Sequence, residues 1–283
     1  ANTTGIKNVS IGQGSFITNT SGNYNTTVGT EALFKSNAPD NTAVGQDALR
    51  CNLRGCYNSA LGRCALYANT TGQSNTAVGT EALRCNTTAN NNTAVGRNAG
   101  EHNTSGAQNT GIGSSALMGY GGTVTGSDNT GVGYFAAGKT TSGTGNTSVG
   151  ARSLCTNTTS SYNTAVGYCA LLTNSGAYNT AVGVVSLCSN TTGSCNTVLG
   201  YAAGRCDASA CQVTFVGMNA GNKNTADSST AVGFGSLANN TSCTGNTALG
   251  FCSLYANTGA NNTAVGNQAL RNNTTANGKV AVG

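Results

Sequence analysis

One short repeat fills the whole chain. The string Asn-Thr-Ala-Val-Gly begins at Asn41, Asn75, Asn92, Asn163, Asn179 and Asn262, and close variants stand between these copies. The glycine that ends each copy, here called the anchor glycine, recurs 17 times from Gly12 to Gly283, at steps of 16 or 17 residues with one step of 20. The long step places a three-residue insertion near residues 118–126. A period of this length predicts a single continuous repeat array over residues 1–283 rather than separate globular domains.

Each repeat predicts a short β-strand that ends at its anchor glycine. An aliphatic residue precedes the anchor in all 17 repeats, and Thr or Ser stands two residues before that in 15 of them. Such alternation is the period-2 pattern of a strand, and the glycine permits a corner with positive φ. The Asn-Thr-Thr-Gly of the second half is turn chemistry. We therefore expect an all-β fold, a parallel β-solenoid or β-roll of about 17 coils of ~17 residues, each with two short strands and two turns.

Stacking explains the unusual composition. The chain has 39 Asn and 41 Gly, and only 7% of its residues are charged. Stacked Asn side chains share amide hydrogen bonds, whereas stacked like charges repel each other. We expect a thin core made of the aliphatic residue before the anchor, the Leu four residues after it, and Ala. At about 4.8 Å per coil, 17 coils would form a rod of roughly 80 Å.

Charge and cysteine content narrow the cellular setting. The net charge of +5 is spread thinly, which disfavours a nucleic-acid partner. No apolar run approaches the roughly 18 residues of a membrane span, and the first residues show no signal sequence, so we expect any targeting segment to have been removed. Twelve cysteines indicate an oxidising compartment, and hence an extracellular, cell-surface or virion-surface location.

The strings that resemble catalytic or nucleotide-binding motifs are explained by the repeat itself. Two Gly-x-Gly-x-x-Ala strings, at Gly111 and Gly131, are ordinary repeat copies without a βαβ context. Glu31 and Asp47 both stand two residues after an anchor and could lie about 5 Å apart, but on a flat ladder we expect solvated carboxylates. The single histidine, His102, has no evident nucleophile partner. We expect neither an enzyme nor a cofactor.

The repeat resembles sequences of known fibrous proteins. The Asn-Thr-Ala-Val-Gly-x-x-Ala-Leu pattern is similar to repeats of phage and environmental tail-fibre proteins, and to the head repeats of trimeric autotransporter adhesins. The resemblance covers nearly the whole chain. It implies a left-handed parallel β-roll and a fibre or adhesin role.

The cysteines predict local disulfides rather than a zinc site. One histidine and no C-x2-C spacing disfavour zinc. Stacked coils would bring cysteines of neighbouring repeats within the ~5.5 Å Cα spacing of a disulfide. The predicted pairs are Cys51–Cys56, Cys206–Cys211, Cys64–Cys85, Cys155–Cys169, Cys188–Cys195 and Cys243–Cys252.

Glycosylation sequons give a second extracellular indication. Asn-x-Ser/Thr occurs at 16 sites, although an Asn/Thr-rich repeat also produces it by chance. Eight of these asparagines fall seven residues after an anchor, on what we expect to be the outer turn. They are the candidates for covalent glycans: Asn19, Asn69, Asn86, Asn103, Asn157, Asn190, Asn240 and Asn273. The sequons of Asn25 and Asn146 overlap the strand and should be occupied less.

Three functions remain open at this point. The first is a structural subunit of an extracellular filament, with copies of the chain joined end to end. The second is a trimeric adhesin or tail-fibre stalk that binds a glycan or cell-surface receptor; small residues flanking the anchor would allow lateral approach in a homotrimer. The third is ice binding by a threonine ladder, which the single Thr per strand, sharing its face with the aliphatic residue, disfavours.

Overall fold

The computed structural model describes residues 2–241 and 243–283 as two units of stacked coils, Ala1–Gly145 and Asn146–Gly283. The first unit contains β1 (Val9–Ile11), β2 (Thr26–Val28), β3 (Thr42–Val44), β4 (Ser59–Leu61), β5 (Thr76–Val78), β6 (Thr93–Val95), β7 (Thr110–Ile112) and β8 (Thr130–Val132). The second contains β9 (Thr147–Val149), β10 (Thr164–Val166), β11 (Thr180–Val182), β12 (Thr197–Leu199), β13 (Thr214–Val216), β14 (Thr230–Val232), β15 (Thr247–Leu249), β16 (Thr263–Val265) and β17 (Val280–Val282).

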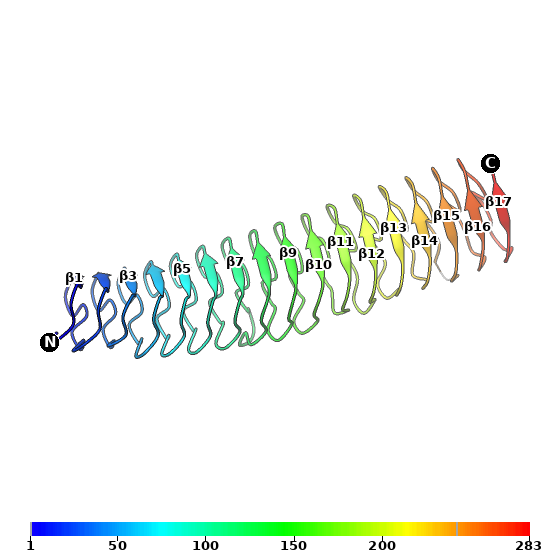
Figure 1. Ribbon diagram of the computed structural model, residues 1–283. Helices are drawn as coiled ribbons and strands as arrows, with labels where there is room; N and C mark the ends of the chain where they lie inside the picture. Colours follow the sequence, from blue (N-terminus) through cyan, green and yellow to red (C-terminus); the bar gives the residue numbers. More distant parts are fainter. Residues whose placement is uncertain (1, 242) are drawn as a thin grey trace. The chain divides into compact units, whose positions relative to one another are not determined.

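Successive strands within each unit pair in parallel and in register. Thr42 of β3 faces Thr26 of β2 and Ser59 of β4, and the same residue-for-residue pairing recurs through both units (Figure 1). Every strand has three residues and ends directly before an anchor glycine. The expected β-solenoid of ~17-residue coils is confirmed, because the repeat places the same residue at the same point of each coil.

The second half of each coil is not a strand, which corrects the expected two strands per coil. After the anchor the chain makes tight turns, such as Ala48 N to Gly45 O at 3.3 Å and Asn52 N to Leu49 O at 3.1 Å. The intervening leucine has positive φ, for example 48° at Leu33 and 51° at Leu66. Leucine rarely adopts this conformation. Here its buried side chain and the hydrogen bonds to the next coil offset the strain.

Glycines that stand at the leucine position have the same positive φ. Gly100, Gly204 and Gly221 each stand four residues after an anchor, where most coils have Leu, and their φ values are 60°, 56° and 57°. Glycine meets no steric penalty in this conformation. Because Gly stands in place of Leu at this position in some coils, the sequence indicated a left-handed backbone conformation there.

In most coils the strand points a small central residue inward and its two flanking residues outward. The central residue of the strand is fully buried, as at Ala43, Ala77 and Ala165. In β12 and β13 the buried central residues are Val198 and Phe215, which pack where Gly204 and Gly221 replace the leucine. The aliphatic residues before the anchors are half-buried or exposed, for example 51% at Leu61 and 60% at Ile11. The expectation that this aliphatic residue fills the core is wrong. The coil is too thin for two large ladders, so Leu on one side faces Ala on the other.

Two interior ladders of asparagine hold the coils together. Four residues before the anchor, the side chain of one coil accepts the backbone N–H of the next: Asn58 N donates to Asn41 Oδ1 at 3.0 Å, and Asn75 N to Asn58 Oδ1 at 3.0 Å. Seven residues after the anchor, Asn69 Nδ2 donates to Asn52 Oδ1 at 2.8 Å. These bonds confirm the expected asparagine ladders and satisfy polar groups that are out of reach of water.

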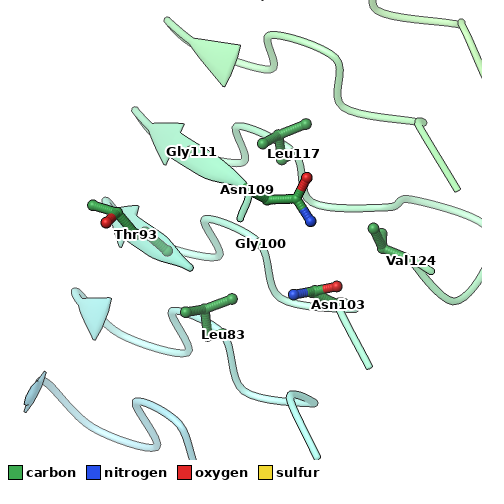
Figure 2. Close-up of a pocket in the computed structure, with 9 residues that line it drawn as sticks. Leu83, Thr93, Gly100, Asn103, Asn109, Gly111, Leu117 and Val124 are labelled. Atoms are coloured by element: carbon green, nitrogen blue, oxygen red, sulfur yellow. The ribbon is translucent and has the colours of Figure 1, made fainter. Parts of the chain in front are cut away.

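One small void interrupts the first unit. A cavity of about 10 Å³ lies where Gly100 replaces the core leucine and Gly111 replaces the central alanine of β7, beside Leu83 and Leu117 (Figure 2). Its volume is close to that of a single water molecule.

Replacing Gly111 with alanine should stabilise the protein by up to about 1 kcal/mol, because a methyl enters the void and the unfolded chain loses freedom. The added Cβ would lie 3.2 Å from Ala116 O and 3.6 Å from Leu117 Cβ. Gly131→Ala is the matched control, since its Cβ would meet Leu117 Cγ at 3.0 Å. Urea unfolding of both variants measures the difference; an equal or larger gain for Gly131→Ala would contradict this reading.

Candidate functional site

The outward face of the strands is the most regular surface of each unit. Thr and an aliphatic residue alternate with the buried residue, so each strand presents one hydroxyl-bearing and one apolar side chain. Neighbouring strands repeat this pair in register, as at Thr164 and Thr180. The expected sharing of one face by Thr and the aliphatic residue is confirmed. The result is a flat array of β-branched side chains.

Glu31 and Asp47, in neighbouring coils, share one ion-pair partner. Both are bound by one cation: Arg50 Nε lies 2.5 Å from Glu31 Oε2 and 3.3 Å from Asp47 Oδ1. The hydrogen bond to Glu31 raises the pKa of Arg50, so the guanidinium keeps its charge.

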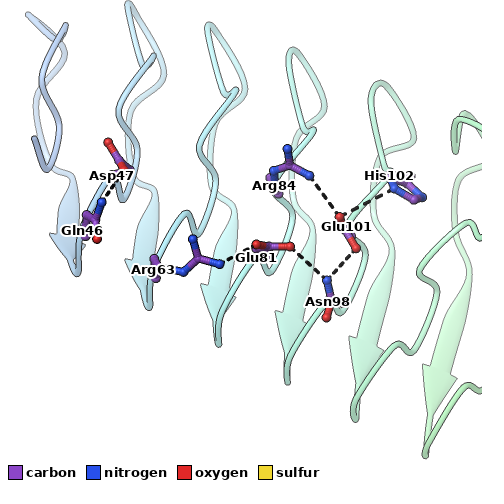
Figure 3. A network of polar contacts seen from close by, with 8 residues as sticks. All are labelled: Gln46, Asp47, Arg63, Glu81, Arg84, Asn98, Glu101 and His102. Atoms are coloured by element: carbon purple, nitrogen blue, oxygen red, sulfur yellow. Dashed lines mark hydrogen bonds and ion pairs between the residues drawn. The ribbon is translucent and has the colours of Figure 1, made fainter.

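Opposite charges continue along the next coils of the first unit (Figure 3). Arg63 Nη2 lies 2.7 Å from Glu81 Oε1, and Arg84 Nη1 lies 3.2 Å from Glu101 Oε1. Asn98 Nδ2 joins the two carboxylates, at 3.3 Å from Glu81 Oε2 and 2.6 Å from Glu101 Oε2. Partly exposed pairs of this kind contribute little to stability. Their alternating signs avoid the repulsion that a single-sign ladder would create.

Cys85 and His102 lie in neighbouring coils beside the insertion, a neighbourhood that the sequence reasoning did not connect. Each stands six residues after its anchor in successive coils, and both line a surface pocket of about 370 Å³ with Gly121, Gly122 and Thr123. His102 Nδ1 lies 3.3 Å from Gly119 O, and Nε2 lies 3.7 Å from Glu101 Oε1. The sequence feature that could have indicated this neighbourhood is the repeat position shared by the two residues, next to the single 20-residue step between anchors.

This pocket lacks the features of a nucleophile or metal site. Burial raises the pKa of the Cys85 thiol. Arg84 opposes this rise and the carboxylates of Glu101 and Glu81 add to it, so the net direction disfavours the reactive thiolate. Within residues 2–241 and 243–283, no group of three or more His, Cys, Asp or Glu side chains could hold a metal ion.

The eight glycan candidates face inward, which corrects their expected place on an outer turn. Asn19, Asn69, Asn86, Asn157, Asn190 and Asn240 are fully buried, Asn103 is 2% exposed and Asn273 is half-buried. Their amide nitrogens are occupied: Asn86 Nδ2 donates to Asn69 Oδ1 at 2.9 Å and to Ala89 O at 3.2 Å. A glycan on such a nitrogen is incompatible with the folded coil. Asn25 and Asn146 are buried too, and Ser242 of the Asn240 sequon lies outside the described residues.

The six predicted disulfides are also wrong. Ten cysteines have free thiols: Cys51, Cys56, Cys64, Cys85, Cys169, Cys188, Cys195, Cys206, Cys211 and Cys252. Each predicted pair contains at least one of them, including the pairs of Cys155 with Cys169 and of Cys243 with Cys252. Stacking brings together residues at the same position of neighbouring coils, and no two cysteines share a position in neighbouring repeats. In the C-x4-C segment of Cys51 and Cys56, Asn52 closes the turn instead, with Nδ2 donating to Gly55 O at 2.8 Å.

Reducing agent should therefore leave the thermal unfolding midpoint unchanged, because the ten free thiols form no cross-link that constrains the unfolded chain. Melting curves with and without dithiothreitol, together with thiol titration of the denatured protein, measure this. A fall of several degrees on reduction would restore the disulfide interpretation.

A buried carboxyl interrupts the asparagine ladder of the second unit. Asp207 is fully buried at the position where neighbouring coils have Asn190 and Asn224. Asp207 Oδ1 accepts hydrogen bonds from Ser209 N at 3.3 Å and Ala210 N at 2.9 Å. Among the described residues, neither Asp207 Oδ2 nor Asn190 Oδ1 has a hydrogen-bond partner. Burial raises the pKa of Asp207 to about 6 against the opposing effect of its backbone hydrogen bonds.

Comparisons with known proteins do not assign the chain to a family. Within residues 2–241 and 243–283, no helix is long and apolar enough to cross a membrane. Comparison with protein-family models and with curated proteins finds no match.

Proposed function

We propose that this chain is a structural subunit of a filament or fibre. The β-solenoid fold is compatible with such a role. The observation that carries the proposal is the continuous hydrogen bonding between successive coils of each unit. An extracellular location stays a prediction from the sequence.

Each coil is joined to the next by three kinds of bond. Strand pairing continues through the turns, as in Leu49 N to Ala65 O at 3.0 Å. Asparagine amides add the two interior ladders, for example Asn163 N to Asn146 Oδ1 at 3.0 Å and Asn190 Nδ2 to Asn174 Oδ1 at 2.7 Å. Because many of these bonds must break together, a stack of this kind resists extension along its axis. Its surfaces, apart from the insertion, repeat with the coil.

Electron microscopy of the purified full chain tests the proposal. We expect filaments, and an oriented sample should give a fibre-diffraction reflection near 4.8 Å from the stacked strands. Particles without any filament at concentrations up to about 100 µM would contradict the structural role.

Ice binding is a second candidate because of the outward strand face. Thr hydroxyl and methyl groups repeat there at about 4.8 Å between coils, and the aliphatic methyls lie about 6.6 Å further along each strand. Strand pairing holds both the row of Thr and the row of aliphatic residues in register, as at Thr180–Val182 and Thr197–Leu199. Such an array can hold a regular layer of water.

Thermal hysteresis tests this candidate directly. The full chain should depress the freezing point below the melting point, and Thr197→Lys in the strand face should remove at least half of that effect. Thr192→Lys, an exposed position in a turn, is the matched control and should leave it unchanged. No hysteresis in the unmodified protein would reject ice binding.

A further inference from the structure

The second unit carries an exposed apolar stripe that the first unit lacks. In six consecutive coils the residue directly after the anchor glycine is large and apolar. These residues, here called the aromatic stripe, are Tyr168, Val184, Tyr201, Met218, Phe234 and Phe251, with exposures of 51%, 42%, 56%, 44%, 41% and 50%. In the first unit the same position holds Gln13, Thr30, Gln46, Arg63, Thr80, Arg97 and Ser114, and only its last coil has a large apolar residue there, Tyr134, 60% exposed.

The stripe is a continuous ladder. Strands β10 to β15 pair in register, so residues at the same distance beyond them lie side by side. Phe234 and Phe251 confirm this directly, with ring centroids 5.3 Å apart and an interplanar angle of 11°. Leu199 and Leu249, 47% and 46% exposed, stand two residues before stripe members and widen the apolar surface.

We propose that the aromatic stripe binds a second copy of this chain. The inference rests on the proposed structural role and names the surface through which copies associate laterally. Half-exposed side chains of this size offer about 100 Å² each, so the stripe with its two leucines presents roughly 700–800 Å², close to the ~800 Å² that one partner contributes to a stable interface.

The charge pattern favours a second copy as the occupant. The next residue of each stripe coil is uncharged: Cys169, Val185, Ala202, Asn219, Gly235 and Cys252. At these positions two identical stripes can therefore meet around a twofold axis without like charges facing each other. Lys223 borders Phe234 and Gly235 in a surface pocket, at the margin of the stripe. Their equal coil spacing also lets the side chains of one ladder enter the gaps of the other, as in stacked sheet interfaces. A stripe of repeats is thus complementary to itself.

Sedimentation velocity of the full chain tests this inference. Before filaments assemble, the unmodified protein should form dimers with a dissociation constant between about 1 and about 100 µM. The triple variant Tyr201→Thr, Met218→Gln, Phe234→Thr introduces residues that the first unit has at this position, and should raise the dissociation constant at least about 10-fold. Tyr57→Ser removes a 63% exposed tyrosine outside the stripe and should leave association unchanged. Circular dichroism checks that each variant is folded.

The outcomes separate the stripe from the filament role. Dimers of the unmodified chain without filaments would contradict the structural role but keep the stripe as the self-association surface. A folded triple variant that still associates with unchanged affinity would overturn the stripe. An unmodified chain that stays monomeric at about 100 µM would overturn it as well, and binding of that monomer to phosphatidylcholine vesicles or to insoluble polysaccharide would assign the stripe to another occupant.

Discussion

Asp207→Asn is expected to stabilise the protein by about 3 kcal/mol above pH 7 and to have little effect near pH 4. The folded-state pKa of Asp207 is about 6, against an ordinary value of 3.8. An acid whose pKa rises on folding begins to destabilise the folded state as the pH rises through its unfolded value. The penalty is complete above the folded value and disappears below the unfolded value. Asparagine removes the buried charge and supplies an amide that can donate to Asn190 Oδ1.

Urea unfolding of both proteins between pH 4 and pH 8 measures this effect. The midpoint of the unmodified chain should fall as the pH rises from 4 to 7, relative to the midpoint of the variant. Asp227→Asn is the matched control: Asp227 is the exposed carboxylate whose charge contributes to the pKa shift of Asp207, so this change should alter stability much less. Parallel pH profiles for the unmodified chain and Asp207→Asn would show that the buried carboxyl does not titrate as described.

Gly233→Ala should destabilise the second unit by at least about 3 kcal/mol. Gly233 is an anchor glycine with φ of 126°, and its added Cβ would lie 2.5 Å from Gly250 O of the next coil. The unfavourable φ and the short contact cannot be relieved separately, because the contacted carbonyl belongs to the hydrogen-bonded backbone of a neighbouring anchor. The same clash is found at anchors in both units, for example Gly62 with Gly79 O at 2.5 Å.

Gly235→Ala provides the matched comparison only two residues away. Gly235 also has positive φ, 61°, but its Cβ would meet only the flexible Cys252 Sγ at 3.3 Å and the Tyr255 ring. Ala202 and Val185 occupy the same repeat position with φ of 52° and 49°. Thermal and urea unfolding should therefore show a small change for Gly235→Ala and a large one for Gly233→Ala. Similar losses for both variants would mean that positive φ alone, rather than the close approach of two coils, makes the anchor glycines necessary.

The repeat predicted the strand before each anchor glycine, but it also predicted a second strand in each coil that the structure does not contain. An aliphatic residue before a glycine, every 16 or 17 residues, located all 17 strands, because residues repeated at a fixed spacing must stack in register. The low charge and the asparagine ladders followed from the same stacking. The alternation could not tell which face of the strand is buried. With a single small residue between Thr and Val, either face satisfies a period of two, and the narrow coil interior selects the small one.

The candidate sites depended on directions that only the folded coil fixes. Asn69 in Asn-Thr-Thr-Gly is equally good turn chemistry with its side chain outside or inside, and the need to satisfy buried amides draws it inward. Cys51 and Cys56 are close in sequence, but Asn52 closes the turn between them. The sequence by itself determined the period, the strands and the stacked architecture. The tertiary structure decided which ladder is core and which is surface, because a three-residue strand around so thin an interior leaves room for one large side chain per coil.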